Sequence, residues 1–329
     1  MTNASAPGKI ILFGEHAVVY ARPAIAVPVL QVRAEATIDA SPSDDVAIDA
    51  ADISRAYTLR DAPDDDPIAV IIRLTCAKLG VEPRGFQVRV RSTIPVARGL
   101  GSGAAVSVAV ARALVKFFAT GDTDASRTEK IKIPMSPMSS MARMSNEEIS
   151  ALAYEVEKLH HGTPSGIDNT VIAFEQPVYF VRDEPIQSFR VARPFTIAIA
   201  DTGIAAPTKI AVGDVRRAWQ ADRARYESLF DQVGAIVRKA RAAIEQGNVD
   251  ALGALMNANQ KLLREIGVSS PEIETLVDAA IRAGARGAKL SGAGRGGNVI
   301  ALVDEVTQDV VGRAMLDAGA RDVIVTLVG

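Results

Sequence analysis

The sequence predicts an α+β protein with two domains. Its 329 residues exceed the length at which a single hydrophobic core usually stops growing. Strand and helix patterns are mixed without strict βαβ alternation, and the second half has the order strand, helices, strand, strand, helix, strand. That order is the split βαβ arrangement of a ferredoxin-like domain. We therefore expect an N-terminal domain over residues 1–185 and a C-terminal domain over residues 186–329.

The first half contains alternating strand patterns and two helical patterns. Periodicity predicts strands at Lys9–Phe13, Ala24–Ala40 and Phe86–Thr93, and helices at Ile68–Leu79 and Ala104–Phe118. Gly80 is a natural C-cap for the first helix. The second helix is apolar on nearly every side, which predicts that it is buried. Gly121–Met144 has no period, and we interpret it as a surface insertion or linker.

A third helix starts at a capping box formed by Ser145 and Glu148. The apolar residues that follow recur at helical spacing and form one stripe: Ile149, Leu152, Ala153, Val156 and Leu159. At about 100° per residue, Glu157 falls on the border of that stripe. A carboxylate there can line a cavity, or it can be a solvated residue on the flank of the helix.

The segment HHGTPSGIDN, residues 160–169, follows this helix. Glycine and proline constrain its backbone, and we interpret it as a loop that holds the carboxylate of Asp168 at the edge of a cavity. An isolated segment of this kind is more often a plain turn. The other glycine-rich segments of the chain are needed to decide between a functional loop and a plain turn.

The second half has clear boundaries. The predicted strands are Phe195–Asp201, Ala288–Ser291, Asn298–Val303 and Asp322–Val328, and the predicted helical regions are Gly213–Gln246, Val249–Ile266, Pro271–Ala283 and Thr307–Ala318.

Composition excludes several classes of protein. A net charge of −2 provides no basic excess for nucleic acid or acidic lipid. The single cysteine, Cys76, rules out an intramolecular disulfide and fits a reducing compartment. The N-terminus lacks the pattern of a signal peptide, no apolar run approaches the roughly 20 residues that span a bilayer, and no G-x-S-x-G elbow occurs. We expect a cytoplasmic protein without a nucleic-acid or membrane partner.

The segment PVARGLGSGAA, residues 95–105, predicts a phosphate site. Gly99, Gly101 and Gly103 let the backbone approach an anion, and the buried helix then points its free N–H groups at the same place. A plain tight turn is the alternative. A Walker A sequence does not occur anywhere in the chain.

Two further features of the sequence bear on a phosphate site. Gly292, Gly294 and Gly297 satisfy G-x-G-x-x-G, but a strand rather than a helix follows, so a tight hairpin loop is the better interpretation. Lys9 follows Pro-Gly and opens a strand. It is either ordinary surface charge or, beside a phosphate site, a cation that holds a phosphoryl group and lowers the pKa of a nearby acid.

Taken together, PGKIILFGEHAVVY, PVARGLGSGAA and KLSGAGRGG resemble the three motifs of the GHMP kinase superfamily, in order and over nearly the whole chain. GEHAVVY and HHGTPSGIDN are similar to its mevalonate kinase group. The resemblance implies an N-terminal domain like domain 2 of ribosomal protein S5, a ferredoxin-like C-terminal domain, ATP and Mg²⁺, and phosphoryl transfer to the primary hydroxyl of mevalonate. A homodimer is common in this family.

The resemblance also implies a role for individual residues. Asp168 is expected to take or orient the hydroxyl proton, Lys9 to stabilise the phosphoryl charge, and Glu157 to hold Mg²⁺. The residues expected to cradle ATP are Ser92, Ala97, Arg98, Gly99, Leu100, Gly101, Ser102 and Gly103. Those expected to border the mevalonate pocket are Glu15, His16 and Thr208.

One departure from the family pattern concerns the metal. The family usually has a second serine where this chain has Gly103, so Ser102 or water must replace a hydroxyl ligand, or metal affinity is lower. Arg295 and Asn298 also differ from common family residues. Two alternatives stay open: a kinase for phosphomevalonate or another small hydroxy acid, for which Arg98, Arg295 and Lys209 are candidate phosphate contacts, and a nucleotide-binding sensor without turnover.

Overall fold

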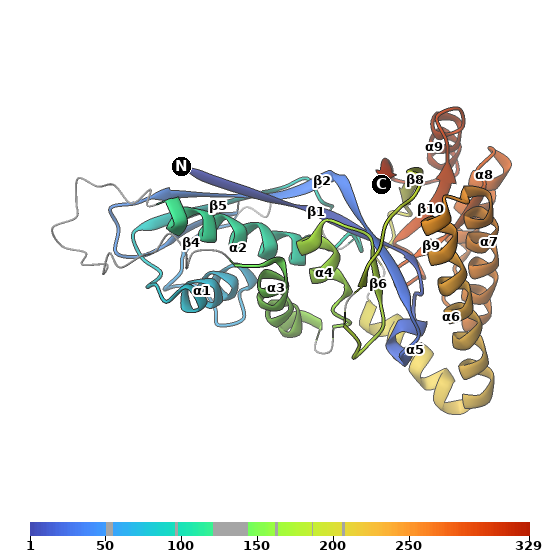
Figure 1. Ribbon diagram of the computed structural model, residues 1–329, viewed down its shortest axis with the longest axis horizontal. Coiled ribbons are helices and arrows are strands. Elements are labelled where there is room, and N and C mark those ends of the chain that lie inside the picture. The colour runs from blue at the N-terminus through green and yellow to red at the C-terminus, as the bar shows by residue number, and fades with distance from the viewer. Residues whose placement is uncertain (51–54, 96–97, 121–143, 162–163, 186, 206–207) are drawn as a thin grey trace. The chain divides into compact units, whose positions relative to one another are not determined.

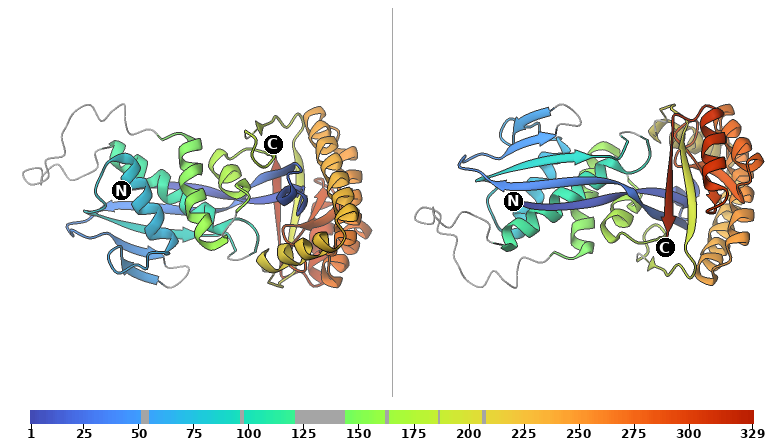
Figure 2. Two further views of the ribbon diagram at one scale, coloured as in Figure 1. Left: turned by 90° about the horizontal axis from the view of Figure 1, so that it is seen from below. Right: turned by 90° about the horizontal axis from the view of Figure 1, so that it is seen from above.

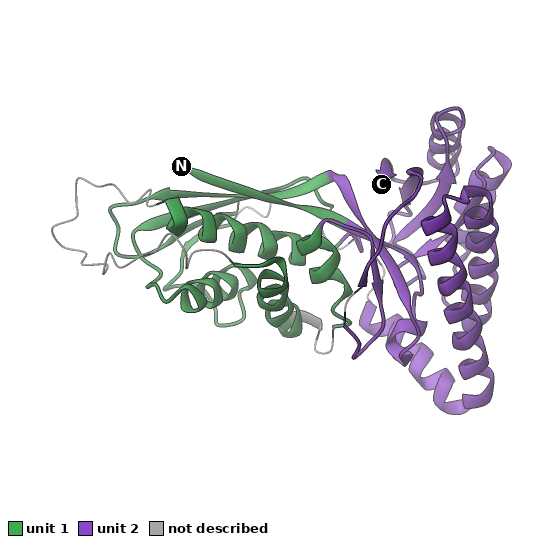
Figure 3. Ribbon diagram, viewed as in Figure 1, with its two compact units in different colours: residues 1–8, 32–95, 101–174 green, residues 9–31, 96–100, 175–329 purple. Residues whose placement is uncertain are grey.

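The chain forms two compact units, each built from several segments (Figure 3). Unit 1 comprises residues 1–8, 32–95 and 101–174, and unit 2 comprises residues 9–31, 96–100 and 175–329. The computed structural model describes residues 1–50, 55–95, 98–120, 144–161, 164–185, 187–205 and 208–329. Two long strands, β1 (Thr2–Phe13) and β2 (Ala24–Ala40), contribute residues to both units.

Unit 1 packs helices on one face of a sheet (Figure 1). Its other elements are β3 (Ala47–Ala50), β4 (Arg55–Thr58), α1 (Pro67–Leu79), β5 (Phe86–Ser92), α2 (Ser102–Thr120), α3 (Asn146–His161) and α4 (Ile167–Phe174). β2 pairs antiparallel with β5, β5 pairs parallel with β3, and β3 pairs antiparallel with β4. Phe86 and Phe117 of the core form a cluster with the half-buried Phe118, and the ring centroids lie 5.2–5.9 Å apart.

Unit 2 contains a four-stranded antiparallel sheet with the strand order β11-β8-β10-β9. The strands of this sheet are β8 (Phe195–Asp201), β9 (Gly287–Ser291), β10 (Asn298–Val303) and β11 (Asp322–Val328). Unit 2 also contains two short strands, β6 (Val178–Phe180) and β7 (Gln187–Ser188). Its helices are η1 (Ala17–Tyr20), α5 (Thr208–Ala221), α6 (Arg223–Gln246), α7 (Val249–Ile266), α8 (Pro271–Arg282) and α9 (Gln308–Asp317). The helices α6–α9 lie on one side of this sheet (Figure 2).

The order of elements in unit 2 confirms the predicted ferredoxin-like arrangement, with a strand, helices, two strands, a helix and a last strand. The predicted helical region Gly213–Gln246 is helical, but it is divided: α5 begins earlier, at Thr208, and ends at Ala221, and α6 follows it. The second begins at Arg223, after the N-cap residue Asp222, whose side chain accepts a hydrogen bond from Arg225 N at 3.2 Å. The helix therefore restarts where a capping residue competes with continued helix.

The helix α2 is buried, as its sequence predicts. It is the one helix within the described ranges that is long and apolar enough to cross a membrane, and 56% of that stretch is covered by the rest of the protein. Ten of its residues belong to the core, which is typical of a central helix. The capping box of α3 is also confirmed: Ser145 N donates to Glu148 Oε2 at 3.0 Å, and Glu148 N donates to Ser145 Oγ at 3.2 Å. The predicted insertion Gly121–Met144 lies outside the described residues, except for its last residue.

Candidate functional site

Residues 95–105, for which the sequence predicts a phosphate site, are called the phosphate segment below. Its last part, in unit 1, leads into the N-terminus of a helix. Gly101 has a φ of 73°, which is the left-handed region that glycine adopts without strain. The helix α2 begins at the next residue, and Ala105 N donates to Gly101 O at 2.9 Å. The N–H groups of the first turn lack acceptors inside the helix, so this end of α2 favours an anion. Ser102 is half-buried here and Gly103 is exposed.

Glu157 on α3 lies beside Gly103 on α2. A Cβ at Gly103 would be 3.4 Å from Glu157 Oε1, so the backbone of Gly103 passes close to this carboxylate. Glu157 is 9% exposed, which agrees with its predicted place on the border of the apolar stripe. Among the residues that the structure describes, no group of three or more His, Cys, Asp or Glu side chains can hold a metal. A single carboxylate suits a hard cation that keeps most of its waters.

Asp168 lies in the first turn of the short helix α4, and the expectation that a loop holds it is wrong. The turn before the helix needs Gly166, whose φ is 84°, and the helix starts one residue later. A carboxylate in a first turn is favoured by the helix dipole. Asp168 is half-buried, so its carboxylate combines a fixed backbone with access to solvent or ligand.

Buried hydrogen bonds anchor α4 on α3. Asn169 Nδ2 donates to Ser150 O at 3.1 Å and to Ser150 Oγ at 2.8 Å. Thr170 Oγ1 donates to Gly166 O at 2.7 Å and closes the preceding turn. These contacts fix the backbone on the C-terminal side of Asp168. Ser92, at the end of β5, accepts a hydrogen bond from Ile94 N at 3.1 Å, so its hydroxyl orders the turn that precedes the phosphate segment.

In unit 2, the first part of the phosphate segment is tied to two strands. Leu100 O accepts a hydrogen bond from Lys9 N at 3.0 Å, which joins the segment to β1. Asn298 Nδ2, at the start of β10, donates to Arg98 O. Arg98 Nη1 lies 3.1 Å from Asp201 Oδ1 at the end of β8. Gly99 takes a φ of 75° between these anchors. The predicted contact residue Ala97 lies outside the described residues.

Residues 14–16, with the sequence GEH, lead into a strained turn centred on His16. His16 has φ 60° and ψ −47°, and Ala17 N donates to Glu15 O at 2.6 Å across it. This is the rare form of the γ-turn, in which the central residue has a positive φ, and non-glycine residues seldom adopt it. Nε2 of His16 lies 2.9 Å from Ala293 O, and burial lowers the pKa of this imidazole to about 4, with the nearby Arg295 acting in the same direction. The ring is therefore neutral near pH 7, with its hydrogen on Nε2 and its lone pair on Nδ1.

Glu15 is fully buried and paired. Lys289 Nζ donates to Glu15 Oε1, and Asn259 Nδ2 donates to Glu15 Oε2 at 3.3 Å. Neither Lys289 nor Asn259 is among the residues that the sequence predicts for the site. Lys289 lies between Ala288 and Leu290 in a strand, and that flanking pattern is the one signal that marks it as a buried cation.

The third glycine segment is a hairpin loop between β9 and β10, as predicted. Arg295 ion-pairs with Asp214 on α5, so it is neither free in solvent nor available as an unpaired cation. Thr208 begins α5 and is exposed.

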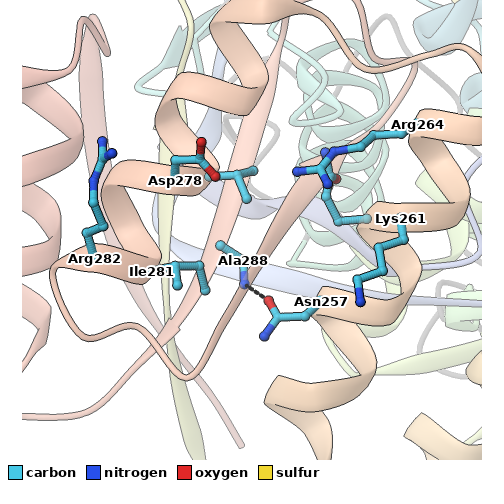
Figure 4. A pocket seen from close by; sticks show the side chains of 9 residues that line it. Asn257, Lys261, Arg264, Asp278, Ile281, Arg282 and Ala288 are labelled. Atoms are coloured by element: carbon cyan, nitrogen blue, oxygen red, sulfur yellow. Dashed lines mark hydrogen bonds between the residues drawn. The ribbon is translucent and has the colours of Figure 1, made fainter.

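A cavity of about 230 Å³ lies elsewhere in unit 2, between α7 and α8 (Figure 4). Lys261 and Arg264 reach it from α7, and Asp278 and Arg282 reach it from α8. Ala288 lies at its floor, where its N–H donates to Asn257 Oδ1 at 3.0 Å. None of the residues that the sequence predicts for the site lines this cavity, so it is separate from the arrangement described above.

Two family models match the sequence. The model of the GHMP kinases N-terminal domain matches residues 67–176, and that of the GHMP kinases C-terminal region matches residues 240–321. The mevalonate kinase of Thermococcus sibiricus is 33% identical over 98% of this chain and 94% of its own length. That of Pyrococcus abyssi is 34% identical over 93% of this chain and 90% of its own. The crystal structure of L. major mevalonate kinase in complex with R-mevalonate has a TM-score of 0.81 and 26% identity, and the match covers 100% of this chain and 96% of that chain.

Proposed function

This chain belongs to the GHMP kinase family, and we propose that it is an ATP-dependent kinase that phosphorylates the primary hydroxyl of mevalonate to give 5-phosphomevalonate. The observation that carries the proposal is the similarity to mevalonate kinases over nearly the full length of both chains. The predicted two-part GHMP kinase fold is confirmed by the two family models and the structural match.

The phosphates of ATP bind at the segment from Ala97 to Gly103, with Ser92 just upstream. Two features support this assignment: the left-handed glycines at 99 and 101, and the free N–H groups at the start of α2. In the reaction, the acceptor oxygen forms a bond to the γ-phosphorus, the bond to the bridging oxygen breaks, and ADP leaves. Such a transfer depends on positioning and on neutralisation of charge more than on covalent help.

Asp168 accepts the proton that the primary hydroxyl releases, and Lys9 neutralises charge on the phosphoryl group. The half-buried first turn of α4 supports the role of Asp168, because a fixed carboxylate can still reach a ligand. Support for Lys9 comes from its backbone hydrogen bond to Leu100, which fixes it to the phosphate segment at close range. Arg98 donates to Asp201 and so orders the segment.

Magnesium belongs to the proposal, with Glu157 as its carboxylate ligand and Ser102 as its hydroxyl ligand. The oxygen of Glu157 beside Gly103 fits a hard cation, and the space at Gly103 fits a metal-bound water. When bound, the ion would neutralise the charge of the phosphates. Among the protein groups, Glu157 would hold the metal ion, and the first turn of α2 offers its N–H groups to the phosphate oxygens.

The acceptor pocket includes His16, Glu15 and Thr208. The neutral ring of His16 presents an acceptor at Nδ1, which suits a hydroxyl group better than a second phosphate. A phosphorylated acceptor would need additional cations, yet Arg98 and Arg295 are already paired with Asp201 and Asp214. This pairing favours mevalonate over phosphomevalonate as the substrate.

Three further assignments complete the proposal. The protein is cytoplasmic, where ATP is available and its buried Cys76 stays reduced. A homodimer, which is common in the family, belongs to the proposal, and the apolar helices of the second half would allow one. Its sequence divides into functional domains at residue 185.

Purified protein would be incubated with Mg·ATP and a panel of mevalonate, phosphomevalonate, homoserine and galactose while ADP release is followed. Turnover confined to mevalonate, and lost in Asp168→Asn, is the expected result. Turnover on another compound would overturn the substrate assignment and keep the family mechanism. ATP binding without turnover on any acceptor would indicate a nucleotide sensor instead.

A further inference from the structure

Glu15 and Lys289 form an ion pair that is completely removed from solvent. Both side chains are 0% exposed although they lie 274 residues apart in the sequence. Lys289 Nζ also donates to Leu290 O at 2.5 Å, and Asn259 Nδ2 donates to the second oxygen of Glu15. Burial lowers the pKa of Lys289, and the charge of Glu15 opposes that shift. Both carboxylate oxygens of Glu15 are therefore engaged by protein donors.

The stability that such a pair contributes does not explain its presence. The cost of removing two charges from water often equals or exceeds their attraction, and apolar residues of similar volume can replace a buried pair without loss. What the pair supplies is a fixed direction for the Glu15 side chain, because the ammonium and the amide hold both of its oxygens. A buried pair of this geometry is best explained by what Glu15 holds in place.

Glu15 is the first residue of the strained turn centred on His16. A γ-turn of this sign persists only when its surroundings hold it on both sides. Before the turn, Gly14 packs so closely that a Cβ would lie 2.5 Å from Ala24 Cα. Within the turn, the His16 ring is bonded to Ala293 O. The side chain of Glu15 is the third restraint, and Lys289 fixes it.

We propose that Lys289 is a positioning residue for the acceptor pocket: it locks Glu15 and thereby holds the strained turn that aims the His16 ring. Glu15 acts through this turn, because Lys289 and Asn259 each hold one of its oxygens. This inference rests on the proposed function for the identity of the acceptor. The arrangement itself lies wholly within unit 2.

The test compares Lys289→Met with the double variant Glu15→Gln/Lys289→Met. The single variant leaves a buried carboxylate without its cation, so it is the one that can fail to fold. The double variant removes both charges and keeps the volume of both side chains. Lys261→Met, an exposed lysine on α7 that lines the separate cavity, is the matched control.

The first readout needs no substrate. The ring resonances of His16 are followed by NMR as a function of pH, and they are assigned by their loss in His16→Gln. In the parent protein this imidazole should titrate near pH 4. In both Lys289 variants its pKa should move at least one unit toward 6.5, because the released turn exposes the ring. In Lys261→Met the titration should not move.

The second readout separates the two substrates. Both Lys289 variants should raise KM for mevalonate at least tenfold while KM for ATP changes less than twofold. Recovery of the parent KM for mevalonate in the double variant would show that Lys289 merely neutralises Glu15, and it would overturn the proposal. An unchanged His16 titration in both variants would overturn it as well. Failure of the parent protein to phosphorylate mevalonate would instead refute the proposed function, with the NMR result still deciding the role of Lys289.

Discussion

Gly103 on α2 lies beside the Glu157 carboxylate on α3: a Cβ at residue 103 would lie 3.4 Å from Oε1, in ordinary van der Waals contact. A serine side chain therefore fits at this position without displacing Glu157. Its hydroxyl would stand next to the one carboxylate that we assign to the metal. The same position thus tests both the identity of the metal site and the consequence of a missing hydroxyl.

Gly103→Ser should tighten divalent metal binding. One added oxygen ligand of the strength of a typical hydrogen bond, about 0.5–1.5 kcal/mol, corresponds to a roughly two- to twelvefold lower Kd. Titration with Mn²⁺ followed by electron paramagnetic resonance measures this without turnover. Gly103→Ala is the control, because it adds the same Cβ without the hydroxyl. Equal behaviour of the serine and alanine variants would mean that the hydroxyl does not reach the metal.

Asn298→Ala should weaken ATP binding and leave mevalonate binding unchanged. The amide of Asn298 donates to Arg98 O, and its loss removes an anchor of the phosphate segment. Loss of one hydrogen bond of about 0.5–1.5 kcal/mol predicts a KM for ATP raised roughly two- to twelvefold. Calorimetric titration with a non-hydrolysable ATP analogue provides the check.

Asp201→Asn serves as a companion to this variant. It keeps the size of the side chain but weakens the ion pair with Arg98, so it should affect ATP in the same direction. An effect of either variant on mevalonate alone would contradict the assignment of residues 98–100 to the nucleotide.

The strand and helix boundaries that follow regular periodicity could be predicted from the sequence. Ala24–Ala40 alternates, Val249–Ile266 has one apolar stripe, and both segments have the predicted bounds. The helix α4 could not be predicted, because its eight residues, five apolar and three polar, are too few to display a period. The break at Asp222 was missed for another reason: local capping by one side chain ends an otherwise continuous pattern.

In the candidate site, too, some features could be predicted from the sequence and others could not. Glycines with positive φ at residues 99 and 101, and the burial of Glu157, agree with their local sequence context. Lys289 could not be identified as the partner of Glu15, because periodicity carries no information about contacts between residues so far apart in the chain. Tertiary packing alone determines which buried charges meet.

The stability of unit 2 should fall as the pH drops from 6.5 to 5. The folded pKa of His16, about 4, lies below the unfolded value of 6.5, so the unfolded chain takes up a proton first. Stability from this group is therefore complete above pH 6.5 and is lost toward pH 4, by roughly 1.5 kcal/mol between pH 6.5 and 5. Urea unfolding followed by fluorescence of Trp219, the single tryptophan, reports on unit 2.

His16→Gln is the reference for this measurement, since glutamine keeps a donor for Ala293 O and does not titrate. The difference in stability between the two proteins should vanish progressively or reverse as the pH falls. Parallel pH profiles for both proteins would show that His16 is solvated in the folded state.

Gly294→Ala should destabilise unit 2 far more than Gly292→Ala. Both glycines have positive φ, 74° and 90°, so alanine at either position carries a backbone cost of about 1–2 kcal/mol. They differ in space: a Cβ at Gly294 would overlap Val268 O, whereas a Cβ at Gly292 meets nothing within 4 Å. Only the first substitution must displace the hairpin loop, and Ala293, whose carbonyl holds His16, lies between the two.

Gly294→Ala should therefore also raise KM for mevalonate, while Gly292→Ala keeps it within about twofold. Urea unfolding and steady-state kinetics on the pair decide the matter, and equal losses in both variants would show that backbone strain, and not the close approach to Val268, determines the shape of this loop.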